Sequence, residues 1–152
     1  MGSLKPNEAA GSIITQSDMQ QRFGEAELIK LTDRAKTRAI DSDVLQQAIN
    51  DAEAEAGSYL AAAGFRLPFA APHTLKVKVC DIARWYLYDN GIAAVVQTRY
   101  DHAIAWLKAV ARNPTMLGLD ADSSQVQAAA QRQIVVIPNQ LGSWKDADTS
   151  PF

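Results

Sequence analysis

The chain has 152 residues, of which 47% are hydrophobic, and a formal net charge of -2. This length suits one domain with a substantial core, and so small a charge does not by itself indicate binding to a polyanion. The single cysteine, Cys80, excludes an internal disulfide bond, which fits a reducing compartment. No apolar run reaches the roughly 18–20 residues that a membrane span requires.

The composition divides the chain into three parts. Residues 1–12 are rich in Gly, Ser, Ala and Asn and lack the apolar centre of a signal peptide, so we expect an added leader or a disordered segment. Residues 13–119 carry helical periodicity and are expected to form the folded domain. Residues 120–152 become polar and irregular, and we expect an extended tail.

Two short helices are predicted at the start of the domain. Thr15 is suited to cap a helix from Gln16 to Phe23, with Asp18 in the third position of a capping box. Gly24 supplies a residue that can end this helix. A second short helix is predicted from Glu25 to Leu31, with acidic residues at its N-terminal end.

A long helix is predicted to follow, capped by Asp41 and ended by Gly64. Its apolar residues recur at steps of 4, 3, 4, 3 and 4, which is the stripe of an amphipathic helix; they are Leu45, Ile49, Ala52, Ala56, Tyr59 and Ala63. Gly57 lies inside this helix at a cost of about 1 kcal/mol relative to Ala, which indicates tight packing or a bend.

Two further long helices are predicted, one from about Pro72 to Asp89 and one from Ile92 to Arg112. Asn90 and Gly91 separate them, and so short a connection makes them antiparallel neighbours. The predicted fold is therefore all-α, with three long helices, two short N-terminal helices and a mostly irregular C-terminal tail.

The tail contains one candidate β-strand, the sequence IVVIP from Ile134 to Pro138. A lone strand leaves its backbone groups unpaired, so it needs a neighbouring edge, which another chain can supply. Alternatively, this segment lies across the helices without strand pairing. The sequence leaves both interpretations open.

Residues able to support catalysis or metal binding do not form a recognisable set. His73, His102 and Cys80 do not have the spacing of a zinc site. Asp51 and Glu55 lie four residues apart, as paired catalytic carboxylates can, but we interpret them as a solvated helix face. We therefore expect no enzyme activity, no metal and no cofactor.

Three groups of residues are candidates for an interface. The connector before the long helix is basic, and a tryptophan and a tyrosine in the sequence ARWYLY project away from the predicted core. The third group is the apolar part of the tail. The candidates are Arg34, Lys36, Arg38, Trp85, Tyr88, Ile134, Val135, Val136, Ile137 and Trp144.

An ordered set of short matches gives the chain a family resemblance over Ile13 to Leu119. The matches are Arg22-Phe23-Gly24, Glu27-Leu28, Leu31-Thr32-Asp33, Ala48-Ile49, Asp51-Ala52, Ser58-Tyr59-Leu60, Leu67-Pro68, Asp81-Ile82-Ala83-Arg84, Tyr86-Leu87 and Arg99-Tyr100. In this the chain resembles the small helical head–tail connector proteins of tailed phages and Mu-like prophages, specifically the Mu-type "gene product thirty-six" group. Ala56-Gly57 and Phe65-Arg66 depart from the expected pattern.

The resemblance implies a non-enzymatic assembly protein of the virion neck, present in the host cytoplasm during assembly. Such a protein would form a ring, commonly of twelve subunits, on the portal protein, extend the channel through which DNA passes, and present a surface to the tail or tail-terminator protein. The basic connector keeps a second interpretation open, a DNA-binding or packaging-associated helical module. A small enzyme that uses Asp51 or Glu55 is the third.

Overall fold

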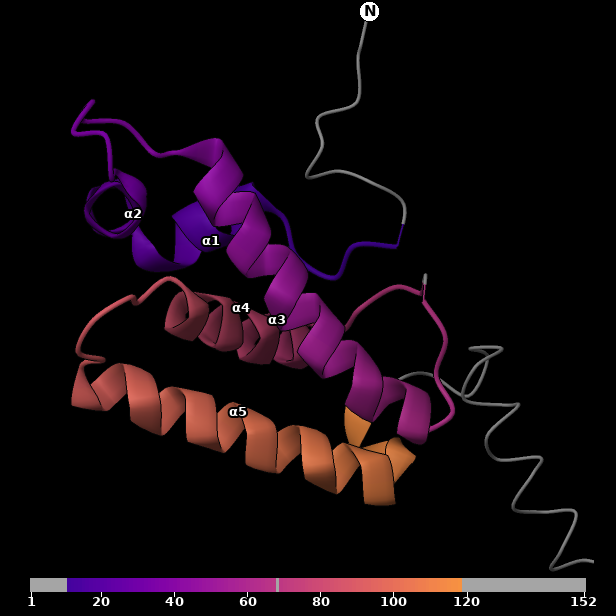
Figure 1. Ribbon diagram of the computed structural model, residues 1–152. Coiled ribbons are helices and arrows are strands. Elements are labelled where there is room, and N and C mark those ends of the chain that lie inside the picture. Colours follow the sequence, from indigo (N-terminus) through magenta and orange to yellow (C-terminus); the bar gives the residue numbers. More distant parts are fainter. Residues whose placement is uncertain (1–10, 68, 119–152) are drawn as a thin grey trace, which may run out of the picture.

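The computed structural model describes residues 11–67 and 69–118, and within these ranges it contains helices and no strand (Figure 1). The helices are α1 (Gln16–Phe23), α2 (Glu25–Thr32), α3 (Ser42–Ala62), α4 (His73–Tyr86), α5 (Ala94–Arg112) and the short 3-10 helix η2 (Pro114–Leu117). The predicted all-α class, with three long and two short helices, is confirmed. The candidate strand from Ile134 to Pro138 lies outside the described residues.

The caps of α1 form as the sequence predicts. The Thr15 hydroxyl accepts a hydrogen bond from the backbone N–H of Asp18 over 3.1 Å, and the Asp18 carboxylate accepts one from the Thr15 N–H over 2.9 Å. Gly24 follows with φ of 88° and serves both as the C-cap of α1 and as the N-cap of α2. This single left-handed residue therefore turns the chain from one short helix directly into the next.

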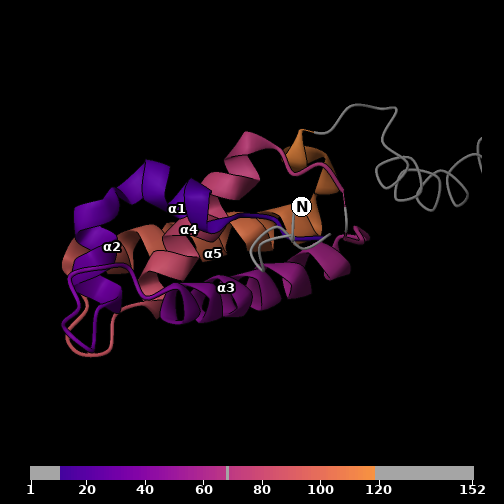
Figure 2. The ribbon, with the colours of Figure 1, turned by 90° about the horizontal axis from the view of Figure 1, so that it is seen from above.

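The three long helices pack against one another and enclose the core. α3 crosses in front of α4, and α5 runs beneath both (Figure 1), while the view from above shows α1 and α2 gathered at one end of the bundle (Figure 2). Fully buried side chains come from every α-helix, and the largest are Ile14, Met19, Leu28, Leu45, Ile49, Leu60, Leu75, Ile82 and Leu107. The short helices thus complete the core that the long helices form.

α4 and α5 are both shorter than predicted, because the connection between them is longer than Asn90 and Gly91. α4 ends at Tyr86, where the N–H of Leu87 bonds to the carbonyls of Ala83 and Arg84 and tightens the last turn. α5 begins only after Ala93, whose carbonyl accepts from two backbone N–H groups of the next turn. The buried Leu87 side chain holds the chain at the point where it leaves α4.

Gly57 is not explained by tight packing. A methyl group added at its Cα would meet no atom within 4 Å, so the predicted close approach of another element is absent among the described residues. α3 runs through this position without interruption to Ala62. The sequence also gave no sign of η2, in which Leu117 returns a buried side chain to the core after α5.

Candidate functional site

Glu55 of α3 joins all three long helices through hydrogen bonds. Its Oε1 accepts from the Tyr86 hydroxyl of α4 over 3.0 Å, and its Oε2 accepts from the Tyr100 hydroxyl of α5 over 2.9 Å. The interpretation of Glu55 as part of a solvated face is therefore wrong. Asp51 is half-buried like Glu55, but it accepts from the Gln47 amide over 3.0 Å. The two carboxylates therefore have different hydrogen-bond partners.

The two tyrosines bound to Glu55 are held in their neutral form. Burial is the largest cause, and the hydrogen bond to Glu55 is the second; together they raise the pKa of Tyr86 to about 12. The same two causes raise the pKa of Tyr100 well above its usual value. Both hydroxyls therefore remain donors throughout the physiological pH range. This arrangement suits a structural link between helices rather than proton transfer.

Trp85, one of the interface candidates, contacts residues of α5. Its ring stacks on Tyr100 with centroids 4.2 Å apart, and its indole N–H donates to the Gln97 side chain over 2.9 Å. It is half-buried, as is Tyr88, which follows the end of α4. An interface role for these two aromatic residues stays a prediction.

Glu53 holds the segment that leads into α1. Its Oε1 accepts from the Ser12 hydroxyl over 2.8 Å, from the Ile13 N–H over 2.7 Å and from the Ile14 N–H over 2.9 Å. Among the described residues, these contacts include Ser12, one residue before the expected start of the domain. Only the path of the described residues before α1 reveals what Glu53 binds.

Ion pairs fasten the short helices to α4. Arg84 donates to Glu27 of α2 from two nitrogens, over 2.6 and 3.1 Å, and its guanidinium lies 4.8 Å from the centroid of the Phe23 ring. Arg22 of α1 reaches the buried Asp81 of α4 over 3.3 Å. The guanidinium of Arg84 bonds to both carboxylate oxygens of Glu27 and lies over the Phe23 ring. These contacts therefore fix the position of the short helices on α4 as well as pairing opposite charges.

The basic connector between α2 and α3 folds around Asp33. The Asp33 carboxylate accepts from the backbone N–H groups of Thr37 and Arg38, each over 2.7 Å. These bonds, of which the one from Thr37 has the largest effect, hold the pKa of Asp33 below its usual value. Lys36 and Arg38 adopt left-handed backbone angles, φ of 58° and 64°, which cost roughly 1–2 kcal/mol for a residue with a Cβ. The connector is thus a structured loop.

The three basic candidates of this loop differ in their surroundings. Arg34 forms an exposed ion pair with Asp89 over 3.0 Å, which ties the loop to the connection after α4. Lys36 and Arg38 are exposed, and no ion pair within the described part of the chain involves either. The other interface candidates lie outside the described residues; they are Ile134, Val135, Val136, Ile137 and Trp144.

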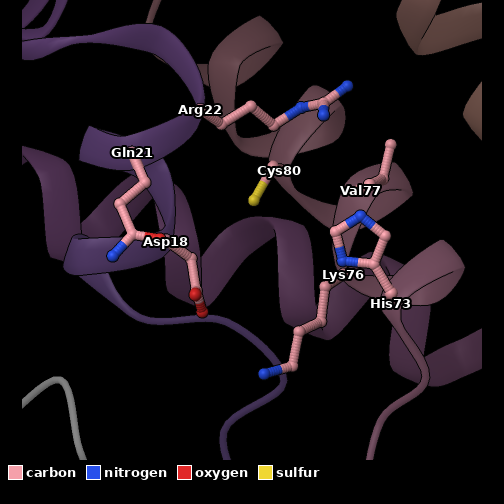
Figure 3. Close-up of a pocket in the computed structure, with 7 residues that line it drawn as sticks. All are labelled: Asp18, Gln21, Arg22, His73, Lys76, Val77 and Cys80. Atoms are coloured by element: carbon pink, nitrogen blue, oxygen red, sulfur yellow. The ribbon is translucent and has the colours of Figure 1, made fainter.

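One hollow, of about 300 Å³, lies between α1 and the start of α4 (Figure 3). Cys80 lies at its base, with Asp18 and Arg22 on α1 and His73 and Lys76 on α4. Burial raises the pKa of the Cys80 thiol to about 12, so the thiol stays neutral and is a poor nucleophile. The other histidine, His102, is exposed on α5.

Within residues 11–67 and 69–118, no group of three or more His, Cys, Asp or Glu side chains is arranged to hold a metal ion. None of the helices in these ranges is both long and apolar enough to cross a bilayer.

A comparison with family models places the chain. The model described as "Bacteriophage Mu, Gp36" matches residues 14–136, which include all five α-helices and extend into the tail. The chain belongs to the bacteriophage Mu Gp36 family. The match to the Gp36 family runs beyond Leu119, the end of the resemblance found in the sequence, and so includes Ile134, Val135 and Val136. No curated protein matches the chain.

Proposed function

We propose that the chain is a head–tail connector subunit of a phage virion. In this role copies of the chain form a ring on the portal protein, extend the channel through which DNA passes without sequence-specific contacts, and present a surface to the tail or tail-terminator protein. The protein assembles in the host cytoplasm and resides in the neck of the virion. Membership of the Gp36 family over residues 14–136 carries the proposal.

The described structure supports this role through its rigidity. Glu55 links the three long helices, and the Arg84–Glu27 pair fastens the short ones, so the body offers fixed surfaces to its neighbours. A body that keeps its shape loses little conformational entropy when it joins an assembly. We propose no enzymatic activity and no cofactor.

The exposed loop supplies a candidate contact with the portal. Lys36 and Arg38 have strained, left-handed backbone angles, and the Asp33 carboxylate holds the loop in this conformation by accepting from the Arg38 N–H. Such strain persists only where surrounding contacts hold the backbone in place. The loop therefore presents two cations in a fixed arrangement. In the proposed function they contact acidic groups of the portal.

The decisive experiment mixes the purified chain with rings of its cognate portal protein. Light scattering after size exclusion, followed by electron microscopy, should show the chain bound to the portal as a ring, and the double variant Lys36→Glu, Arg38→Glu should bind less. The variant Lys30→Glu is the control for charge reversal outside this loop, and it is compared with each of the single variants Lys36→Glu and Arg38→Glu, because it changes an exposed cation on α2. Failure of the wild-type chain to bind portal rings would contradict the proposed function.

The basic loop also motivates the alternative, a DNA-binding or packaging-associated module. It predicts duplex binding that weakens steeply with salt and falls when Arg34 and Lys36 are replaced. The ion pair of Arg34 with Asp89 reduces the positive charge available to a phosphate. Salt-dependent binding of the isolated chain to duplex DNA, without binding to the portal, would favour this alternative.

A further inference from the structure

A second hollow, of about 290 Å³, lies between the first half of α3 and the end of α4. Its walls include the apolar side chains of Val44, Ala48 and Leu87, and two carboxylates, Asp43 and Asp51, lie among them. A hollow of this volume is at the small end of the range for ligand sites and suits one or two inserted side chains.

The hollow carries uncompensated negative charge. Arg34 also lines it, but its guanidinium is paired with Asp89 over 3.0 Å. Within the described ranges, neither Asp43 nor Asp51 takes part in an ion pair. The hollow is therefore complementary to a segment that is both apolar and basic.

Such a segment exists on α5 of the same protein. Val95, Arg99, His102 and Trp106 recur at steps of 4, 3 and 4 and so form one stripe along the helix. The stripe flanks the buried face of α5; Val95 is 50% exposed, Arg99 and His102 are exposed, and Trp106 is half-buried. Within the described part of the chain Arg99 has no ion pair.

We infer that the hollow of one copy receives the α5 stripe of a second copy. Val95 would cover the apolar wall, and the Arg99 guanidinium would pair with the Asp51 carboxylate, which lines the hollow. Tryptophan and arginine beside an exposed apolar residue are the composition that dominates binding energy at protein interfaces. This inference rests on the proposed function, since it names the contact between subunits of the ring.

The hollow and the stripe are different surfaces, so one contact leaves a free hollow on one copy and a free stripe on the other. A head-to-tail contact of this kind propagates, and it closes into a ring where the rotation between copies allows. The predicted species is therefore larger than a dimer. Because the contact pairs opposite charges, its strength falls as salt rises.

Charge reversal tests the contact on the full chain by sedimentation velocity at low salt. Arg99→Glu and Asp51→Lys should each weaken self-association by about tenfold or more, because each places like charges together. An equimolar mixture of the two variants should restore association, since each reversed surface then meets its opposite. Thermal melting checks that both variants remain folded.

Lys108→Glu is the matched control. It makes the same change of charge on the same helix as Arg99→Glu, but nine residues away, which is about two and a half helical turns and hence the opposite flank. It should leave association unchanged. An equal loss with Lys108→Glu, a mixture that does not recover, or a wild-type chain that is monomeric at low salt and high concentration would overturn the inference.

The portal experiment separates this inference from the proposed function. If the wild-type chain binds portal rings but the Arg99→Glu and Asp51→Lys variants form the same complete ring there, the connector role stands and this contact is wrong. If the chain self-associates through these residues but does not bind the portal, the contact stands and the connector role is wrong.

Discussion

The hydroxyl of Tyr100 donates to Glu55 over 2.9 Å and so links α5 to α3 inside the bundle. Tyr86 of α4 donates to the same carboxylate over 3.0 Å. One charged acceptor therefore satisfies donors from both of the other long helices. Removing either partner leaves a polar group without its bond in a partly desolvated place.

Tyr100→Phe should lower the free energy of unfolding by about 1–2 kcal/mol, since it removes a hydrogen bond to a charged acceptor and leaves the ring packing in place. Glu55→Ala should cost more, because it leaves two hydroxyls without their acceptor. Denaturant unfolding measures both. Equal stability of Tyr100→Phe and the wild type would show that the bond contributes nothing net.

Alkaline pH should destabilise the fold through Tyr86. Its pKa is raised from 10.0 to about 12 by burial and by Glu55, so the folded state holds the proton more tightly than the unfolded state. The resulting stability is fully present below pH 10 and is lost as the pH rises towards 12. Stability measured across this range should fall less steeply in Tyr86→Phe than in the wild type.

Arg84→Lys should loosen the short helices despite keeping the charge. Lysine cannot reproduce the two bonds to Glu27 or the planar contact with Phe23. The free energy of unfolding is therefore expected to fall by about 1–2 kcal/mol. Hydrogen exchange should rise more in α1 and α2 than in α5. A uniform rise over all helices would instead indicate that Arg84 stabilises the whole bundle.

Lys36→Gly should stabilise the isolated chain by about 0.5–1 kcal/mol, because glycine removes the strain of the left-handed backbone at some cost in unfolded-state entropy. Asp33→Ala should have the opposite sign, since it removes the acceptor around which the loop folds. The pKa of Asp33 is lowered in the fold, so its contribution is present above its unfolded pKa and fades as the pH falls through the lower, folded value. Thermal melts of both variants test these signs.

Gly57→Ala should stabilise the isolated chain by about 0.5–1 kcal/mol, the difference in helix propensity, because nothing lies within 4 Å of the added methyl group. Thermal unfolding measures the change. If the Gly57→Ala variant is more stable than the wild type but does not assemble, the added methyl group blocks a neighbouring subunit that approaches α3 at this residue. Lower stability would show that the space is not open in solution.

The sequence alone determined the features that depend on neighbours along the chain. The capping box of Thr15 and Asp18, the turn at Gly24 and the cap of Asp41 involve bonds across two to four residues, so their residue types specify them. The apolar stripes of the long helices follow from periodicity in the same way, and they gave the all-α class. The sequence did not determine helix ends that depend on packing with distant segments, such as the end of α4 at Tyr86.

Only the tertiary structure decided what the polar residues of α3 do. Glu53, Glu55 and Asp51 look alike in the sequence, yet Glu53 binds residues 12–14, Glu55 binds two tyrosines and Asp51 lines a hollow. The difference arises because their partners are distant in the sequence. Ile13 is 40 residues from Glu53, and Tyr86 and Tyr100 are 31 and 45 residues from Glu55. The hollow that Asp51 lines is formed with the end of α4. Local periodicity reports which side of a helix is apolar, whereas the packing of distant segments sets the partner of each charge.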